Sequence, residues 1–357
     1  MAAQVPAAPA KATPLGHSRA GQSMAADATA APAEAWSYRT ARGRAARRYA
    51  RAMPPDAARP PGARRAAVVA NPTKHDDIAR LKDAVRAAMT EHGWDEPLWF
   101  ETTRADPGAG LAAQAVRSGV DLVLACGGDG TVTACAQGVA GSGVPLGILP
   151  SGTGNLLARN LGLPLDPGAA LVTALTGTNR RLDTGSANGH TFVVMAGIGF
   201  DAKMLGDSSE PLKRRLGWAA YVLSALRHLR DRPVRVSLVA DGGTPLRVRA
   251  SAVIVGNVGW LQGGIRLLPD ALPDDGTLNA VVLTARGWAG WLRLAVRVLL
   301  RRESPGQMTW VQFRQLTIHA DREQPWELDG EVMGGTRRLM ITTQPGRVLM
   351  RVPATQG

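Results

Sequence analysis

The spacing of apolar residues between positions 66 and 177 alternates between two patterns. Short apolar runs, typical of buried strands, alternate with stretches in which apolar residues recur every three or four positions, as in helices packed on a sheet. This rhythm predicts a parallel sheet with helices on both faces. The expected strands are Ala66–Ala70, Pro97–Thr102, Asp121–Cys126 and Pro145–Pro150, and the expected helices are Asp76–His92, Gly110–Ser118, Thr133–Ala140 and Leu156–Leu161.

After residue 177 the pattern changes to one typical of antiparallel β structure. Many of the apolar runs are rich in valine and other β-branched residues, and several are separated by turns such as Asp241–Gly243. Two segments with helical spacing, Pro211–Arg230 and Trp288–Arg302, interrupt the series. The expected strands are Arg180–Gly185, His190–Met195, Val234–Ala240, Leu246–Val255, Thr277–Leu283 and Gln312–Ala320.

Residues 1–65 differ in composition from the rest of the chain. They carry 11 lysine and arginine residues but only 3 acidic ones, which accounts for +8 of the net charge of +13. The segment is rich in alanine, proline and arginine and has no apolar period, so we expect it to be disordered. It is either an extension without a function or an electrostatic anchor to anionic phospholipid, at about 1 kcal/mol per basic residue near the surface.

Composition also bounds the class of protein. An apolar content of 45% is enough for two hydrophobic cores. Two cysteines without metal-ligand spacing favour a reducing compartment, and we find no apolar run typical of a signal peptide or a membrane span. No basic-aromatic motif indicates a nucleic-acid partner. These features predict a cytoplasmic protein.

Two glycine-rich turns follow neighbouring predicted strands. Glycine lets backbone N–H groups approach a ligand closely, and N–H groups beside a helix N-terminus favour anions. Because the carboxyl ends of parallel strands share one edge of the sheet, we expect the turns to lie together. Asp129 would repel a bare phosphate, so a magnesium-bound nucleotide is the simplest ligand. The turns contain Gly127, Gly128, Asp129, Gly130 and Thr131, and Ser151, Gly152, Thr153, Gly154 and Asn155.

The motif GGDGT, followed by PSGTGNLLARNLGLP, resembles the catalytic domain of diacylglycerol kinases and sphingosine kinases, especially the bacterial soluble lipid kinases. GGDG alone is shared with NAD kinases and phosphofructokinases, but the pair is more specific. The resemblance, from about Ala66 to about Pro353, implies an α/β plus β fold: a small doubly wound parallel-sheet domain and then an antiparallel β-sandwich. The regions expected are 1–65 (basic extension), 66–177 (nucleotide-binding domain) and 178–357 (lipid or substrate domain, with the last strand allowed to return to the first).

The resemblance implies ATP and Mg²⁺ as cofactors. It assigns nucleotide contacts to both glycine turns and to loops after the first two strands. In the first loop, Lys74 and His75 replace the usual Ser-Gly of the family. Lys74 is either a phosphate ligand or a solvated lysine. The residues assigned from these loops are Asn71, Thr73, Lys74 and Thr102.

The resemblance also implies a magnesium site in the second domain. Asp275 would contribute its side chain, while Leu272 and Thr277 would contribute backbone carbonyls, as suits a hard cation. The alternative is an Asp-Gly turn that needs no metal. Asp183 resembles an aspartate at the entry to the second domain, which holds a water on magnesium or caps a turn.

Near the end of the chain, Asp329-Gly330-Glu331 places two carboxylates two residues apart. In an extended backbone their side chains would point to the same side. The resemblance implies that Glu331 is the base that deprotonates the lipid hydroxyl, with Asp329 as its support or substitute and Asp129 completing the catalytic set. The alternative is a plain Asp-Gly turn.

These residues predict an ATP-dependent lipid kinase that most plausibly converts diacylglycerol to phosphatidic acid. A sphingoid-base or other lipid kinase, a NAD kinase and a nucleotide-binding regulator without activity are the alternatives. The two interrupting helices combine tryptophan with arginine, typical either of a membrane interface or of a helix packed on the β domain. We therefore expect peripheral membrane association, with a homodimer as a further option.

Overall fold

A computed structural model describes residues 64–75, 77–199, 233–261, 265–285, 290 and 307–354. The basic extension up to residue 63 lies outside this range. So do the predicted helices Pro211–Arg230 and Trp288–Arg302, apart from Gly290. Within the described ranges, no helix is both long enough and apolar enough to span a membrane.

The four predicted parallel strands are confirmed and lie side by side in one large mixed sheet. Their order is β2–β1–β3–β4, with Val68 of the second strand in this order paired to Trp99 on one side and Leu124 on the other. Three of the four are buried along their whole length, as their uninterrupted apolar runs require. The strands are β1 (Ala66–Ala70), β2 (Leu98–Glu101), β3 (Leu122–Gly127) and β4 (Leu146–Pro150).

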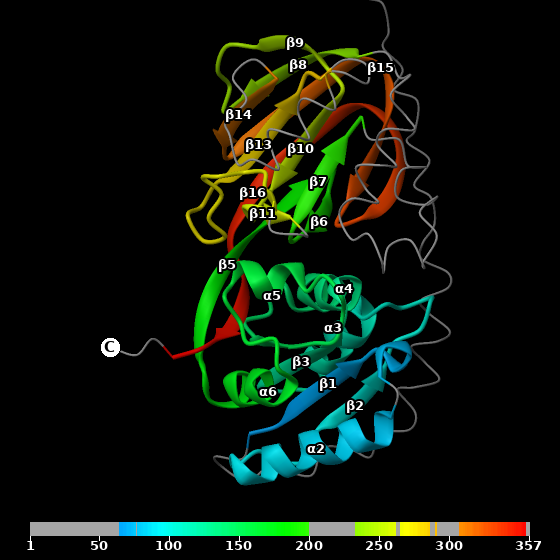
Figure 1. Cartoon of the computed structure of the whole chain (residues 1–357), viewed down its shortest axis with the longest axis vertical. Helices are drawn as coiled ribbons and strands as arrows, with labels where there is room; N and C mark the ends of the chain where they lie inside the picture. The colour runs from blue at the N-terminus through cyan, green and yellow to red at the C-terminus, as the bar shows by residue number, and fades with distance from the viewer. Residues whose placement is uncertain are drawn as a thin grey trace, which may run out of the picture. The chain divides into compact units, whose positions relative to one another are not determined.

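Helices cover both faces of this parallel sheet (Figure 1). One core packs residues such as Ala112 and Cys135 against the strands, and a separate core on the other face contains Val85 and Leu171. The structure adds α6, which no predicted element covers and which begins with an Asp166 cap. The helices are α2 (Ile78–Glu91), α3 (Ala109–Arg117), α4 (Asp129–Val139), α5 (Leu156–Asn160) and α6 (Pro167–Thr176), with a short 3₁₀ turn, η1 (Pro72–Lys74).

The second half of the chain is antiparallel, as predicted, but three predicted strands are each divided in two. The breaks fall at Val193–Val194, Ser251 and Arg314. At the first and third breaks the backbone N–H groups donate to aspartate side chains, which removes them from the sheet ladder. The strands are β5 (Thr178–Ala187), β6 (His190–Phe192), β7 (Met195–Ile198), β8 (Val234–Ala240), β9 (Leu246–Ala250), β10 (Ala252–Gly256), β11 (Trp260–Leu261), β12 (Ile265–Arg266), β13 (Leu278–Leu283), β14 (Met308–Phe313), β15 (Gln315–Leu328) and β16 (Glu331–Val352).

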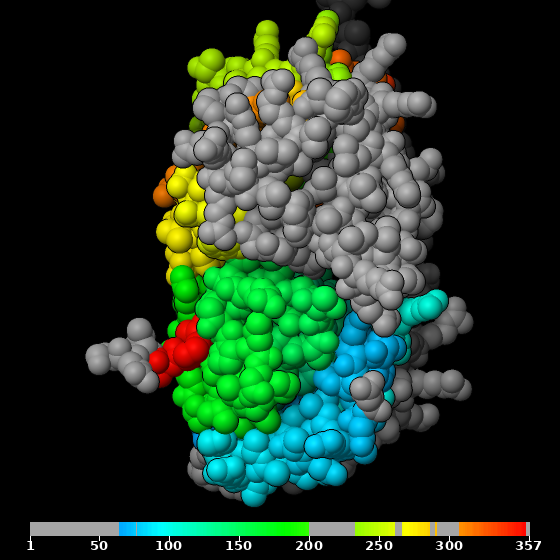
Figure 2. All heavy atoms as spheres, in the orientation of Figure 1, coloured from blue at the N-terminus to red at the C-terminus, as the bar shows by residue number. Residues whose placement is uncertain are grey.

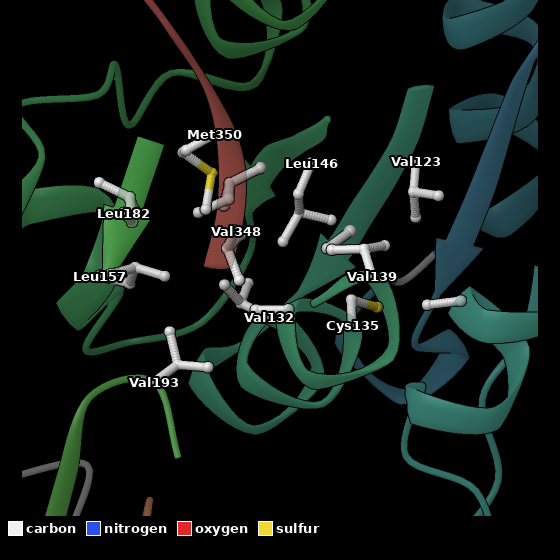
Figure 3. Packing of buried hydrophobic residues seen from close by; sticks show 14 of the residues in the cluster. Val123, Val132, Cys135, Val139, Leu146, Leu157, Leu182, Val193, Val348 and Met350 are labelled. Carbon is white, nitrogen blue, oxygen red and sulfur yellow. The ribbon is translucent and has the colours of Figure 1, made fainter. Parts of the chain in front are cut away.

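The long strand β16 joins the two halves of the sheet. It pairs antiparallel with β15 and β5, and its Met350 lies opposite Leu146 of β4 in parallel register. Val348 and Met350 are fully buried in the same core as β3 and β4 (Figure 3). In Figure 2 the green atoms of the α5–α6 region adjoin blue and cyan surface atoms that include α2. The end of β16 is therefore part of the parallel half.

Replacing Met350 with alanine should destabilise the protein strongly. The side chain has no exposed surface, so truncation leaves a cavity and should lower the free energy of unfolding by about 2–5 kcal/mol. Met340→Ala on the same strand is the matched control, because Met340 is 48% exposed and its truncation should cost less than about 0.5 kcal/mol. Urea unfolding measures both, and equal effects would contradict the shared core.

Candidate functional site

The two glycine turns contact each other at the carboxyl ends of β3 and β4. Ser151 N donates to Gly127 O at 3.0 Å. A Cβ on Gly152 would lie only 2.7 Å from the Cα of Gly128, so the two backbones approach too closely for a side chain. Leu156 N donates to Asp129 Oδ1, which fixes the first turn to the start of α5. The predicted juxtaposition of the turns is confirmed.

Helix α4 begins at Asp129, four residues earlier than predicted. Its cap residue Gly128 provides no side-chain acceptor, so no local cap signal marks the helix start. Thr131 lies in the first turn, is buried and accepts a 3.4 Å hydrogen bond from Asn71 Nδ2. The N–H groups of this first turn, at the positive end of the helix, are the donors that would meet an anion.

The loop after β1 reaches the same edge of the sheet. Asn71 Oδ1 accepts from both Thr73 N (3.0 Å) and Thr73 Oγ1 (2.8 Å), which shapes the loop as a tight turn. The Cε atom of Lys74 lies 3.9 Å from where a Cβ of Gly128 would be. His75 Nε2 is 3.4 Å from Ser151 Oγ. Lys74 and His75 therefore extend over the two glycine turns.

The remaining predicted nucleotide contacts differ in exposure. Thr102 is buried at the end of β2, with its N–H bonded to Ala70 O at 2.9 Å. Thr153 is exposed. Asn155 has a left-handed backbone (φ 48°), which asparagine tolerates better than most residues, and its Oδ1 accepts from Gly152 N at 3.0 Å. Thr153 is the member of this turn whose side chain is open to solvent.

The Asp329-Gly330 pair forms the two-residue turn between β15 and β16. The expectation of an extended backbone is wrong here, because φ is +49° at Asp329 and +87° at Gly330, and Leu328 pairs directly with Glu331. Asp-Gly is a favoured sequence for such a turn. Glu331 stands exposed at the first position of β16.

The carboxylate of Asp329 is held by successive backbone N–H groups. Its oxygens accept from Val193 N (2.9 Å), Val194 N (2.8 Å) and Met195 N (2.9 Å). Burial raises the pKa of Asp329, and these bonds oppose that shift. Gln137 Nε2 also donates to the carboxylate, at 3.4 Å. The turn is thereby anchored to the segment between β6 and β7 and to α4.

Gln137 connects the carboxylate turn to the helix that begins at Asp129. The two residues are eight positions apart on α4, or about 12 Å along the helix axis. Gln137 also donates to Thr191 O at 3.1 Å. Gln137 and the amides of residues 193–195 are not part of a sequence motif. Their role depends on a carboxylate more than a hundred residues away in sequence, so no local pattern identifies them.

The predicted magnesium ligands of the second half lie together around one loop. Asp183 is buried, and its two oxygens accept from Gly276 N (2.6 Å) and from Gly346 N (2.7 Å) at a bulge in β16. Asp275 Oδ1 accepts from Thr277 N (2.9 Å) and Thr277 Oγ1 (2.7 Å). The contacts of Asp275 are those of a turn, the alternative given for its loop, and the oxygens of Asp183 cap backbone N–H groups, the alternative given for that residue.

Leu272, from the same loop, is exposed. Across the described part of the chain, no group of three or more His, Cys, Asp or Glu side chains could hold a metal. At the glycine turns, one oxygen of Asp129 has no described hydrogen-bond partner and is a hard donor suited to Mg²⁺. Such an ion would depend on one carboxylate and phosphate oxygens, as magnesium sites of this type commonly do.

Comparisons with known proteins agree with this geometry. The model of the "Diacylglycerol kinase catalytic domain" matches residues 65–187, and that of the "YegS C-terminal NAD kinase beta sandwich-like domain" matches residues 193–351. A solved structure of a diacylglycerol kinase from Bacillus anthracis str. Sterne has the same fold, with a TM-score of 0.65 at 24% identity over 81% of this chain and 96% of that one. The predicted fold class is confirmed.

Two curated relatives cover most of the described chain. A "Probable lipid kinase YegS-like" from Pseudomonas fluorescens is 33% identical over 285 residues, which are 76% of this chain and 92% of the relative. The "Diacylglycerol kinase" of Bacillus subtilis is 29% identical over 276 residues, 76% of this chain and 91% of the relative. The chain therefore belongs to the YegS-like and diacylglycerol kinase-like family of lipid kinases.

Proposed function

We propose that this kinase transfers the γ-phosphate of ATP to the hydroxyl of diacylglycerol and forms phosphatidic acid. The observation that carries the proposal is the connection of two sites by α4. The helix begins at the glycine turns with Asp129, and its Gln137 contacts the carboxylate turn that presents Glu331. The name of the Bacillus subtilis relative supports diacylglycerol as the acceptor.

Phosphate binding falls to the glycine turns. Phosphoryl transfer has a loose transition state, so catalysis depends mainly on positioning and on electrostatic stabilisation of the phosphate oxygens. The N–H groups in the first turn of α4 supply fixed donors, and Lys74 supplies a point charge from the loop above Gly128. Asp129 would hold Mg²⁺, whose chemical contribution is to neutralise charge on the phosphates.

The proton of the attacking hydroxyl goes to Glu331. The alcohol oxygen forms a bond to the γ-phosphorus while the bond to the bridging oxygen of ADP breaks, and Glu331 accepts the hydroxyl proton. Asp329 is a poor substitute for this base, because its carboxylate already accepts from three backbone amides and Gln137. We assign it the role of holding the turn that carries Glu331.

Access to a lipid requires contact with a membrane surface. The chain carries an excess of basic charge, and most of it lies in residues 1–65. This supports peripheral association of a cytoplasmic enzyme with anionic phospholipid, which high salt should weaken. Sedimentation with anionic and with neutral vesicles, with and without residues 1–59, tests this part of the proposal.

The purified protein should label diacylglycerol from γ-labelled ATP in the presence of Mg²⁺. Sphingoid bases and NAD are offered in parallel, because they are acceptors for kinases with similar glycine motifs. Label in phosphatidic acid supports the proposal. Label confined to a sphingoid base or NADP, or nucleotide binding without turnover, would contradict it.

Substituting Glu331 with glutamine should lower kcat by about 10²- to 10⁴-fold, because the glutamine side chain has nearly the same shape but cannot act as a general base. Binding of ATP should be unchanged. Glu323→Gln is the control, since Glu323 is an exposed glutamate of the preceding strand and its loss should leave kcat unaffected. Rates close to those of the wild type for Glu331→Gln would refute the choice of base.

Substituting Asp329 with asparagine should reduce both stability and turnover. The amide nitrogen cannot accept a hydrogen bond, so at least one buried N–H of residues 193–195 loses its partner, at about 1–3 kcal/mol. Denaturant unfolding and kcat are measured together, with Asp321→Asn as an exposed control. Unchanged stability would show that the amide cradle does not anchor the turn.

A further inference from the structure

One outer face of the β domain carries a patch of basic side chains. Strands β9, β8, β15 and β16 are neighbours in the sheet, in that order. Residues such as Val236, Ile318 and Leu339 pack in the core of the β domain, so the residues that alternate with them face the other way. All the basic residues of this outer face are exposed, and we call the surface the arginine face. It contains Arg235, Arg247, Arg249, His319 and Arg338.

The strand register brings these side chains together. Ser237 of β8 lies opposite Arg247 of β9 on one side and opposite His319 of β15 on the other. His319 in turn lies opposite Arg338 of β16. Neighbouring strands are about 4.8 Å apart, so this row crosses about 14 Å of sheet. The arginine face is therefore one continuous patch, although its residues are spread over a hundred positions of sequence.

Arg235 and Arg249 lie directly opposite each other on β8 and β9, and like charges at such positions destabilise a sheet. The four strand segments of the face, 234–240, 246–250, 315–320 and 336–342, contain no acidic residue. The ion pairs among the described residues involve α2, β2, β5 and the loops beside them. Within the described ranges, the two arginines thus have no carboxylate partner that offsets their repulsion, which favours a partner outside the chain.

Protection of a sheet edge accounts for only part of the charge. Among the described strands, β9 has a neighbour on one side only, and charged residues on such a strand discourage pairing with other chains. This explains Arg247 and Arg249. It does not explain Arg235 or Arg338, because β8 and β16 have neighbours on both sides.

The composition of the face fits an anionic lipid surface better than a nucleic acid. Its four strand segments contain no Trp, Tyr or Phe, so they offer no aromatic ring on which a base could stack. Arginine binds phosphate oxygens through two N–H groups of its planar guanidinium. Arginines spaced along rigid neighbouring strands match the phosphate groups of a bilayer surface, which need no particular sequence or groove.

We propose that the arginine face docks the kinase on a bilayer surface that contains anionic phospholipid, in addition to the contact proposed for residues 1–65. The inference rests on the proposed function, which requires the enzyme to reach a lipid in a membrane. Arg338 follows Glu331 by seven residues on β16, at most about 25 Å along the strand, so docking through this face keeps the carboxylate turn near the surface. Phosphatidic acid, the proposed product, is itself anionic and would strengthen the attachment as it accumulates.

Replacing both Arg235 and Arg249 with glutamine separates docking from folding. The double variant loses two charges that repel each other, so its stability should equal or exceed that of the wild type. Its affinity for vesicles of phosphatidylcholine and phosphatidylglycerol should fall roughly 5- to 30-fold, because each basic residue near such a surface contributes about fivefold. The matched control replaces Arg80 and Arg117 with glutamine. These are exposed arginines of α2 and α3, so net charge changes equally and vesicle affinity should not change.

Co-sedimentation of the full chain with vesicles, at low and at high salt, measures these affinities, and urea unfolding measures stability. Equal vesicle affinities for the double variant and the control would overturn the inference. So would a double variant that aggregates but binds vesicles as the wild type does, because the arginines would then only protect a sheet edge. Tighter binding of the wild type to an oligonucleotide than to the anionic vesicles would overturn it as well.

Failure of the inference is distinguishable from failure of the proposed function. A short-chain diacylglycerol in free solution needs no docking, so the double variant should phosphorylate it with the kcat of the wild type. Its apparent KM for diacylglycerol in anionic vesicles should rise about as much as its vesicle affinity falls. If the wild type labels no diacylglycerol, the proposed function fails, and the vesicle affinities still test the face. If the wild type labels it and the double variant matches the wild type on vesicles, the docking role fails alone.

Discussion

The site depends most on one contact, in which the Asp329 carboxylate accepts hydrogen bonds from three consecutive backbone N–H groups. Two of those amides lie between β6 and β7, and the third is that of Met195, the first residue of β7. The same contact that holds the turn before Glu331 therefore also interrupts the strand that the apolar pattern would otherwise continue. Asn257 also binds this segment, because its Nδ2 donates to Val193 O at 3.3 Å. Through Gln137 the contact extends to α4.

The protein uses one kind of chemistry twice. The first-turn N–H groups of α4 are the donors that we propose for phosphate, and at residues 193–195 backbone N–H groups bind a carboxylate of the protein itself. A buried carboxylate is tolerated only when such donors replace its lost hydration. Glu327 lies two residues away, and its Oε2 atom has no hydrogen-bond partner in the described structure; burial, with a smaller contribution from Asp329, raises its pKa to about 7.

The parallel half was predictable because its signals are local. Apolar runs located β1 to β4, and the glycine turns predicted the edge where Gly128 and Gly152 meet. The structural features that the sequence could not predict depend on contacts between residues far apart in the chain. The division of β6 from β7 requires Asp329, and the turn-capping contacts of Asp183 require Gly276 and Gly346. The early start of α4 at Asp129 could not be predicted either, because its cap residue Gly128 has no side-chain acceptor.

The pairing of β16 with β4 has a consequence for how the protein is made. Met350 and Leu146 lie opposite each other although more than two hundred residues separate them along the chain. During synthesis, the outer edge of β4 stays without its partner strand until the last part of β16 has left the ribosome. Such long-range closure slows folding, and a nascent chain that pauses before residue 346 would present an open apolar edge to chaperones or to other chains.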